Sequence, residues 1–261
     1  MNKKIILIIS SLLTQITYSA PISQFVTVDY EHRNYTHNRG NNNLSSILYG
    51  AKYQQASIVA KVTNGIRNVD NERDTGTEGK IDFYYNWNKN FSTKTGFSLS
   101  DGNSTFLHNE LRQDFNFKPI KNLILTLGGK HTEYAKDIKV DSVSTGLTYY
   151  YDRAIISYKY SYFTSKEKKN SHGNILSIKL KDGTGSGNTQ LWLGLGTGAY
   201  SYEWDDDLSN RNTNFKSVTL RREQPISKHW SVGLALGRNW YDSPIDQYTA
   251  INAKIDATYK W

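Results

Sequence analysis

The chain of 261 residues contains no cysteine, so disulfide bonds are excluded, and so is the lipid-attachment cysteine of a lipoprotein. After the N-terminal segment, no apolar run approaches the roughly 20 residues that a transmembrane helix needs. Helical periodicity of convincing length is missing there as well. These absences exclude a helical membrane protein. The low mean hydropathy of −0.64 does not exclude a membrane protein made of strands, because each strand can turn half of its side chains to water.

Aromatic residues, in contrast, are plentiful. They make up 13% of the chain and include 19 tyrosines and 6 tryptophans. This composition suits the aromatic girdles of a membrane protein, where the ring lies in lipid and the polar tip stays in water. A tyrosine-rich soluble β-sandwich is the alternative that composition alone leaves open.

The N-terminus has the layout of an export signal. Lys3 and Lys4 form a short basic region, and residues 5–13 form an apolar segment of suitable length. Small residues around Ser19 and Ala20 provide a cleavage site, so we predict a signal peptide at residues 1–20 and an exported domain at 21–261. Removal of the two lysines lowers the formal net charge from +8 to +6, a mild excess that does not indicate a nucleic-acid partner.

The last residues of the chain alternate strictly between apolar and polar side chains. From Ile251 to Trp261 every odd position is apolar or aromatic and every even position is polar, which is the period of a β-strand with one greasy face. A strand that ends the chain on an aromatic residue is typical of the closing strand of a transmembrane barrel. We expect it to pair with the first strand, around Val26 to Tyr30, and to be the strand that barrel-assembly machinery reads.

Similar alternating runs recur along the chain, separated by clusters of Asn, Gly, Asp and Ser. We count fourteen, with twelve as the alternative because some runs are weak. They predict an all-β fold: a closed, antiparallel, up-and-down transmembrane β-barrel, in which closure satisfies every backbone group in lipid. The runs lie at residues 26–30, 47–53, 58–62, 80–87, 91–99, 110–117, 123–130, 143–151, 156–162, 176–181, 191–196, 218–220, 230–236 and 251–261.

The connections between runs are mostly short on one side and longer and more polar on the other. We predict a short turn at Lys118 to Asn122 and a long loop in the charged segment Val69 to Gly79. This pattern is typical of an outer-membrane barrel with both termini in the periplasm. We therefore predict the bacterial outer membrane, with its lipid and lipopolysaccharide, as the location.

The chain resembles the YaiO-type family of outer-membrane barrel proteins. The resemblance is carried by LILTLGGKHTEY at 123–134, VSTGLTYYY at 143–151, ISYKY at 156–160 and SKHWSVG at 227–233. These motifs are patterns of strands and turns and carry no catalytic signature. The resemblance implies a barrel in the outer membrane, implies no active site, and suggests at most an envelope glycan as a partner.

The polar face of the alternating runs carries many charged residues that we expect to face the lumen. Three acidic residues, Asp29, Glu31 and Glu223, are expected on this face in addition to the main set that ends this paragraph. A charged, water-filled path with a mild preference for anions is one interpretation, and a lumen filled by ion pairs is the other. The main set comprises Arg33, Lys61, Lys80, Asp82, Lys94, Glu110, Arg112, Asp114, Lys130, Lys159, Lys179, Arg221, Lys254 and Asp256.

A hydrolase is a further interpretation, since barrel hydrolases use a His-x-Ser pair that places base and nucleophile on one face. His229 and Ser231 have this spacing, and both are expected to face inward, beside a short turn on the periplasmic side. Such enzymes need the pair near the outer leaflet, so we assign no catalytic residue. The other histidines lack metal-ligand spacing, and we predict no metal and no cofactor.

The sequence thus favours a non-enzymatic envelope protein: a passive channel or export component for a charged or sugar-like solute, such as an anionic solute or an envelope polysaccharide. The alternative is a structural or interaction barrel with a closed lumen, whose extracellular loops bind glycans or other partners. An outer-membrane hydrolase is the third interpretation.

Overall fold

A computed structural model describes residues 20–69, 72–101, 106–134, 138–165, 170–183, 187–198, 213–242 and 246–261. The predicted signal peptide, apart from Ala20, lies outside these residues. The described part of the chain forms fourteen antiparallel strands in one closed barrel. The count of fourteen predicted from the alternating runs is confirmed, and the alternative of twelve is wrong.

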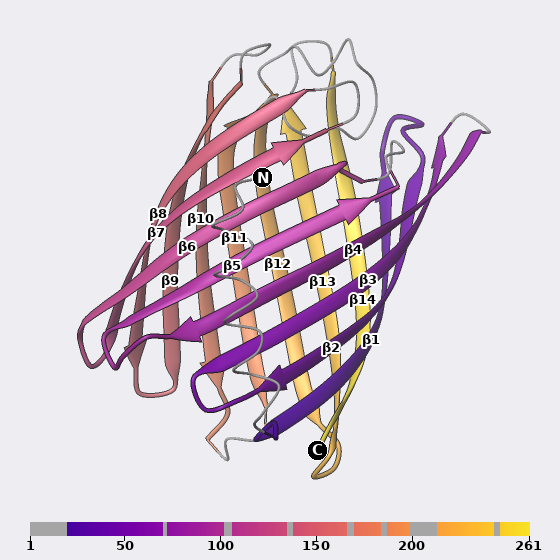
Figure 1. The fold of residues 1–261 in the computed structure, drawn as a ribbon. Coiled ribbons are helices and arrows are strands. Elements are labelled where there is room, and N and C mark those ends of the chain that lie inside the picture. Colours follow the sequence, from indigo (N-terminus) through magenta and orange to yellow (C-terminus); the bar gives the residue numbers. More distant parts are fainter. Residues whose placement is uncertain are drawn as a thin grey trace.

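Each strand pairs with its sequence neighbours, and the strands run tilted around the barrel (Figure 1). Their bounds are β1 Ser23–Tyr35, β2 Asn41–Lys52, β3 Ala56–Val69, β4 Glu72–Asn86, β5 Phe91–Ser100, β6 Asn109–Ile120, β7 Leu123–Glu133, β8 Lys139–Tyr151, β9 Ala154–Thr164, β10 Ser171–Lys181, β11 Asn188–Gly198, β12 Thr213–Pro225, β13 Trp230–Asp242 and β14 Gln247–Lys260.

The barrel closes between its first and last strands, as predicted. Val26 of β1 lies opposite Tyr259 of β14, and Tyr30 lies opposite Ile255. Closure leaves no unpaired strand edge, which a lipid environment would penalise. The start of β1 and the end of β14 therefore lie at one end of the barrel, called the terminal end below (Figure 1). The opposite end is called the distal end.

Alternation along each strand separates an apolar outer face from a polar inner face. In β13, Trp230, Leu234 and Leu236 are exposed on the outside, while Ser231 and Ala235 between them are buried. An apolar band on the outside is the arrangement expected in lipid. At the terminal end this band finishes in an aromatic cluster, where the Tyr259 ring lies 5.0 Å from Trp230 and 5.6 Å from Trp261.

Two expected connections are strand in the structure. The predicted loop from Val69 to Gly79 is wrong, because β3 reaches Val69 and β4 begins at Glu72, with Gly65 paired to Gly76. Backbone pairing between strands does not require apolar side chains where a hairpin lies in water. The polar composition of this segment therefore did not indicate the end of the strands. The predicted turn at Lys118 is also too long, since β6 continues to Ile120 across a register irregularity.

Among the described residues, no helix is long and apolar enough to cross a membrane.

Candidate functional site

The charged residues predicted to face the lumen lie in strands, at positions that alternate with the exposed apolar rows. Most of them form two networks of ion pairs. One network occupies β1, β3, β12 and β14 around the closure of the barrel, and the other occupies β4 to β7.

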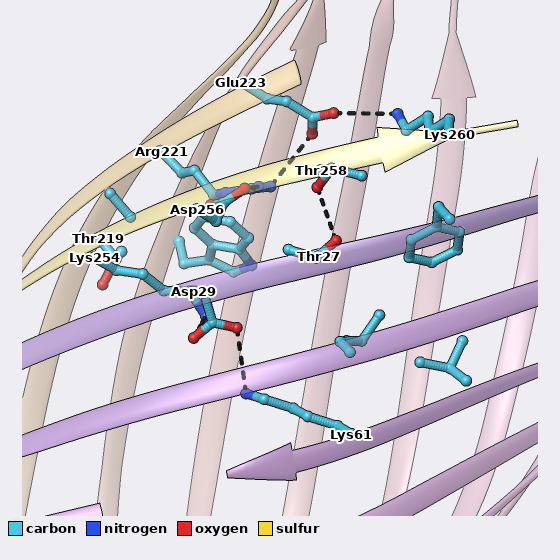
Figure 2. Close-up of a pocket in the computed structure, with 15 residues that line it drawn as sticks. Thr27, Asp29, Lys61, Thr219, Arg221, Glu223, Lys254, Asp256, Thr258 and Lys260 are labelled. Carbon is cyan, nitrogen blue, oxygen red and sulfur yellow. Dashed lines mark hydrogen bonds and ion pairs between the residues drawn. The ribbon is translucent and has the colours of Figure 1, made fainter. Parts of the chain in front are cut away.

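In the first network, one aspartate holds two lysines from different strands. The Asp29 carboxylate of β1 lies 3.0 Å from Lys254 Nζ of β14 and 3.9 Å from Lys61 Nζ of β3 (Figure 2). Because β14 is the neighbour of β1 in the closed barrel, the pair of Asp29 with Lys254 links the N-terminal and C-terminal parts of the chain.

Arg221 of β12 is the second anchor of this network. Its Nη2 donates to both oxygens of Asp256, at 2.9 and 3.0 Å, and its Nη1 donates to Glu223 at 3.4 Å. Glu223 also lies 3.7 Å from Lys260 Nζ (Figure 2). On β1, the neighbouring pair is Arg33 with Glu31, at 3.0 Å.

The second network repeats this pattern on β4 to β7. Lys94 pairs with Asp82 at 3.2 Å and Arg112 with Asp114 at 2.6 Å. Glu110 lies between two bases, 3.2 Å from Lys130 Nζ and 3.9 Å from Lys80 Nζ.

Two predicted bases stand apart from these pairs. Lys159 of β9 lies within electrostatic range of Arg112, Asp114 and Lys130, and Lys179 of β10 acts on Glu223 in the same way. Neither lysine has an ion pair within the described part of the chain. Their positive charges are therefore the least compensated ones in the predicted set.

Glycines on neighbouring strands make room for three of the carboxylates. Gly96 lies opposite Asp82, Gly128 opposite Asp114 and Gly233 opposite Asp256. A Cβ atom at these glycines would lie only 2.6, 2.3 and 2.3 Å from the nearest carboxylate oxygen. Each aspartate side chain thus lies flat against the barrel wall, over a position that holds no side chain.

This packing makes the exposed charge of the lumen mainly positive. In all ten ion pairs of the two networks, counted over the described residues, the base is more exposed than the acid. The Asp29 side chain is 5% exposed against 29% for both Lys61 and Lys254, and Asp256 is 4% exposed against 26% for Arg221. The cationic groups are therefore the more exposed partners on the inner surface.

A cavity of about 730 Å³ opens on this surface near the terminal end. Its polar lining includes most of the first network, among them Asp29, Arg221 and Lys254 (Figure 2), and its apolar lining includes Trp192 of β11 and Phe25 of β1. A cavity of this size with aromatic walls and several charged groups has the properties of a small-molecule site.

The distal end of the same wall is lined differently. Tyr35, Tyr241 and Tyr248 are buried there with Ala250, and Phe215 packs against them. The Tyr241 and Tyr248 rings stack at 4.6 Å with an interplanar angle of 13°. The Arg39 guanidinium, from the connection after β1, lies 4.1 Å from the centre of the Tyr248 ring, and Asp246 holds it at 3.4 Å. We call Tyr35, Tyr241, Tyr248, Ala250 and Phe215 the tyrosine cluster.

The His229 and Ser231 pair does not have the geometry of a catalytic dyad. Ser231 is buried at the start of β13, whereas His229 lies in the preceding turn with its Nδ1 2.8 Å from the carbonyl oxygen of Lys260. The His229 ring lies against Tyr259 of the outer aromatic cluster, at 5.9 Å. The prediction that both side chains face inward is therefore wrong for His229, because the strand begins one residue later. No group of His, Cys, Asp and Glu that could hold a metal ion occurs among the described residues.

Several contributors to the inner surface were missing from the predicted set. Glu78 faces inward next to Lys80, and it was overlooked because its segment was expected to be a loop. Lys260 follows the even-numbered phase of the last strand, so the alternation itself could have found it. The tyrosine cluster was also missed, although Tyr241 and Tyr248 pair within the β13–β14 hairpin and continue the inward phase of Ala235 and Lys254. Only the contact with Tyr35 depends on closure of the barrel.

A family model described as "YaiO membrane beta barrel domain" matches residues 23–203. The chain belongs to the YaiO membrane β-barrel family. Its membership confirms the predicted resemblance and, together with the barrel itself, the outer membrane as its location.

Solved structures of outer-membrane proteins share this fold at very low identity. A "CymD monoaromatic hydrocarbon channel" is 8% identical with a TM-score of 0.61, covering 95% of this chain and 90% of that one. A "Bacterial polysaccharide outer membrane secretin" is 8% identical with a TM-score of 0.59, covering 93% and 100%. An "Anion-selective porin from Comamonas acidovorans" is 10% identical with a TM-score of 0.51, covering 93% and 100%. At such identities the likeness concerns the fold alone.

Proposed function

We propose that this protein is a passive outer-membrane channel for anionic solutes, with both termini in the periplasm. The observation that carries the proposal is the unequal exposure within the lumenal ion pairs. In every pair the base is more exposed than the acid, and Asp82, Asp114 and Asp256 lie against glycines of the wall. A passage lined by exposed cations lowers the energy of an anion inside it and raises that of a cation.

The dimensions of the barrel are consistent with a passage. Eight strands enclose an interior that side chains fill, and sixteen to eighteen leave an aqueous channel. A barrel of fourteen strands lies between these cases, so the size of its inward-facing side chains decides whether the interior stays open. Many inner positions carry Ser or Thr, including Ser98, Ser144 and Thr132, which fill less of the interior than larger residues would.

Within this function, the cavity favours an acidic sugar as the solute. Trp192 and Phe25 offer flat apolar faces on which the carbon–hydrogen faces of a sugar ring can pack. Lys61, Arg221 and Lys254 offer donors for carboxylate groups in the same cavity. An anion-selective porin and a polysaccharide secretin share the fold of this chain.

Ion selectivity in planar bilayers tests the proposal. In a salt gradient the wild-type barrel is expected to show a reversal potential of the sign that indicates anion preference. The variant Lys159→Gln/Lys179→Gln removes two inner bases without leaving a carboxylate unpaired, so its reversal potential should move toward zero. The control Lys89→Gln/Lys121→Gln removes two bases from exposed turns and should change the potential little. Cation preference in the wild type would contradict the proposal.

The second candidate is an interaction barrel with a closed lumen. The tyrosine cluster favours it, because buried aromatic side chains occupy the distal end of one wall. Folded protein that inserts into bilayers and yields no conductance steps would support this candidate against the channel.

We also propose that the barrel works without catalysis. The positions of His229 and Ser231 support this view, since their side chains point to different faces. A Ser231→Ala variant should leave any hydrolytic activity of a preparation unchanged, and loss of activity in that variant would contradict us.

A further inference from the structure

Two basic residues lie on the outer, lipid-facing surface of β12 and β13 near the distal end. Lys216 is exposed and lies opposite Trp240, while Arg238 is exposed and lies opposite Val218. In this diagonal arrangement the Cβ atoms of the two bases are separated by about 7–8 Å. The Arg238 guanidinium lies 5.1 Å from the centre of the Trp240 ring, which holds it at the surface.

These bases lie at the distal edge of the apolar band. Next to them on the same face, toward the terminal end, are Leu220 and Leu236, which are more than half exposed. Trp230 marks the other edge of the band on β13. The stretch from Trp230 to Trp240, in a tilted strand, spans roughly the 25 Å of an outer-membrane apolar band. Lys216 and Arg238 are therefore at head-group depth.

Two other outward-facing bases, Arg222 and Lys139, are compensated by carboxylates. Arg222 pairs with Asp182 at 2.5 Å, and Lys139 pairs with Glu133 at 2.9 Å. Lys216 and Arg238 have no such ion pair within the described residues. The nearby carboxylate on this face, Asp242, instead accepts a hydrogen bond from Gln247 at 3.1 Å.

We propose that Lys216 and Arg238 bind a phosphate group of the phosphorylated glycolipid of the outer leaflet, the lipid A part of lipopolysaccharide. Unpaired cations at a lipid boundary are stabilised by anionic head groups, and arginine binds phosphate with two parallel hydrogen bonds. A phosphate placed between the two bases can contact both, while its acyl chains lie along Leu220 and Leu236. The proposal rests on the orientation proposed above, and it does not depend on conduction.

Native mass spectrometry of the full, detergent-folded barrel tests this site. Bisphosphorylated lipid A is expected to bind the wild type, and Lys216→Ala/Arg238→Ala should weaken binding by about tenfold or more, since each base near an anionic surface contributes measurably. The control Lys89→Ala/Lys121→Ala should bind like the wild type. Equal binding by the folded Lys216→Ala/Arg238→Ala variant would overturn the proposal.

Ligand variation keeps the test decisive even if that variant folds poorly. Wild-type protein should lose most of its affinity for lipid A from which both phosphates have been removed, and undiminished affinity would refute a phosphate site. Preference for phosphatidylglycerol over lipid A would refute the outer-leaflet assignment. Displacement of lipid A by millimolar inorganic phosphate would show a free-anion site and would also overturn the proposal.

Discussion

One wall of the barrel, made by β12, β13, β14 and β1, carries different inward-facing side chains at its two ends. At the terminal end, charged side chains line a cavity of about 730 Å³. At the distal end, the aromatic rings of the tyrosine cluster are buried on the inner surface. The strands and their alternation are the same at both ends. The comparison shows that the same inward-facing alternation can expose charged side chains at one end and bury aromatic ones at the other.

The largest expected effect comes from removing the anchor of the terminal end. Arg221→Ala leaves Asp256 buried without its guanidinium partner, and we expect a loss of about 2 kcal/mol of stability, below the value for fully buried pairs because lumenal water reaches Arg221. Denaturant unfolding in detergent, followed by tryptophan fluorescence, measures this loss. Lys159→Ala, which breaks no ion pair of the described residues, is the control. A similar loss in both variants would mean that the carboxylate contact is unimportant.

At the distal end, Tyr248→Ala removes the ring between Arg39 and Tyr241. We expect a loss of about 1–2 kcal/mol, because a stacked and buried aromatic ring is deleted from a partly hydrated lumen. Single-channel conductance should also rise if this end is the narrow one. Tyr150→Ala, at an inward but 39% exposed position, should change neither quantity much. Unchanged conductance in Tyr248→Ala would place the constriction elsewhere.

A smaller change tests whether glycine keeps the carboxylates against the wall. Gly233→Ala places a methyl group in steric conflict with Asp256 Oδ2, since an ideal Cβ would be 2.3 Å from that oxygen. We expect a stability loss of about 1 kcal/mol and a weaker anion preference, because the displaced carboxylate moves into the lumen. Gly79→Ala, whose Cβ has no neighbour within 4 Å, is the matched control. An unchanged reversal potential in Gly233→Ala would show that ion selectivity does not depend on the position of the Asp256 carboxylate.

The smallest effect concerns a charge outside the lumen. Hydrogen bonds from Arg222 hold the pKa of Asp182, in the turn after β10, below its ordinary value of 3.8. A carboxyl group with a lowered folded-state pKa stabilises the fold fully above its unfolded pKa, and this contribution disappears as pH falls through the folded pKa. The difference in stability between wild type and Asp182→Asn should therefore be small and constant above pH 4 to 5 and vanish in stronger acid. A difference that grew on acidification would contradict this assignment.

Much of the fold followed from alternation. The pairing of Val26 with the last strand could be predicted because the number of antiparallel strands is even and the barrel has to close. The extension of β3 to Val69 and of β4 from Glu72 could not be predicted, because the sequence of this segment lacks the apolar row that marks a membrane strand. His229 was assigned to the wrong face for a related reason, since a period-two pattern does not show at which residue a strand begins.

The candidate site was only partly predictable. Alternation indicates which residues share the inner face with Lys61 or Asp114, but not which of them touch. The contact between Asp114 and the space above Gly128 depends on register, because a shift of one residue would turn every side chain to the other face.

The sequence by itself determined the alternation of apolar and polar residues, and hence a closed membrane barrel with charges inside. Only the tertiary structure decided how those charges are exposed. Carboxylates lie against the wall where register places a glycine beside them, and the longer basic side chains extend past them into the lumen. The physical reason is that exposure depends on cross-strand neighbours, and these are set by register and closure rather than by any local run of residues.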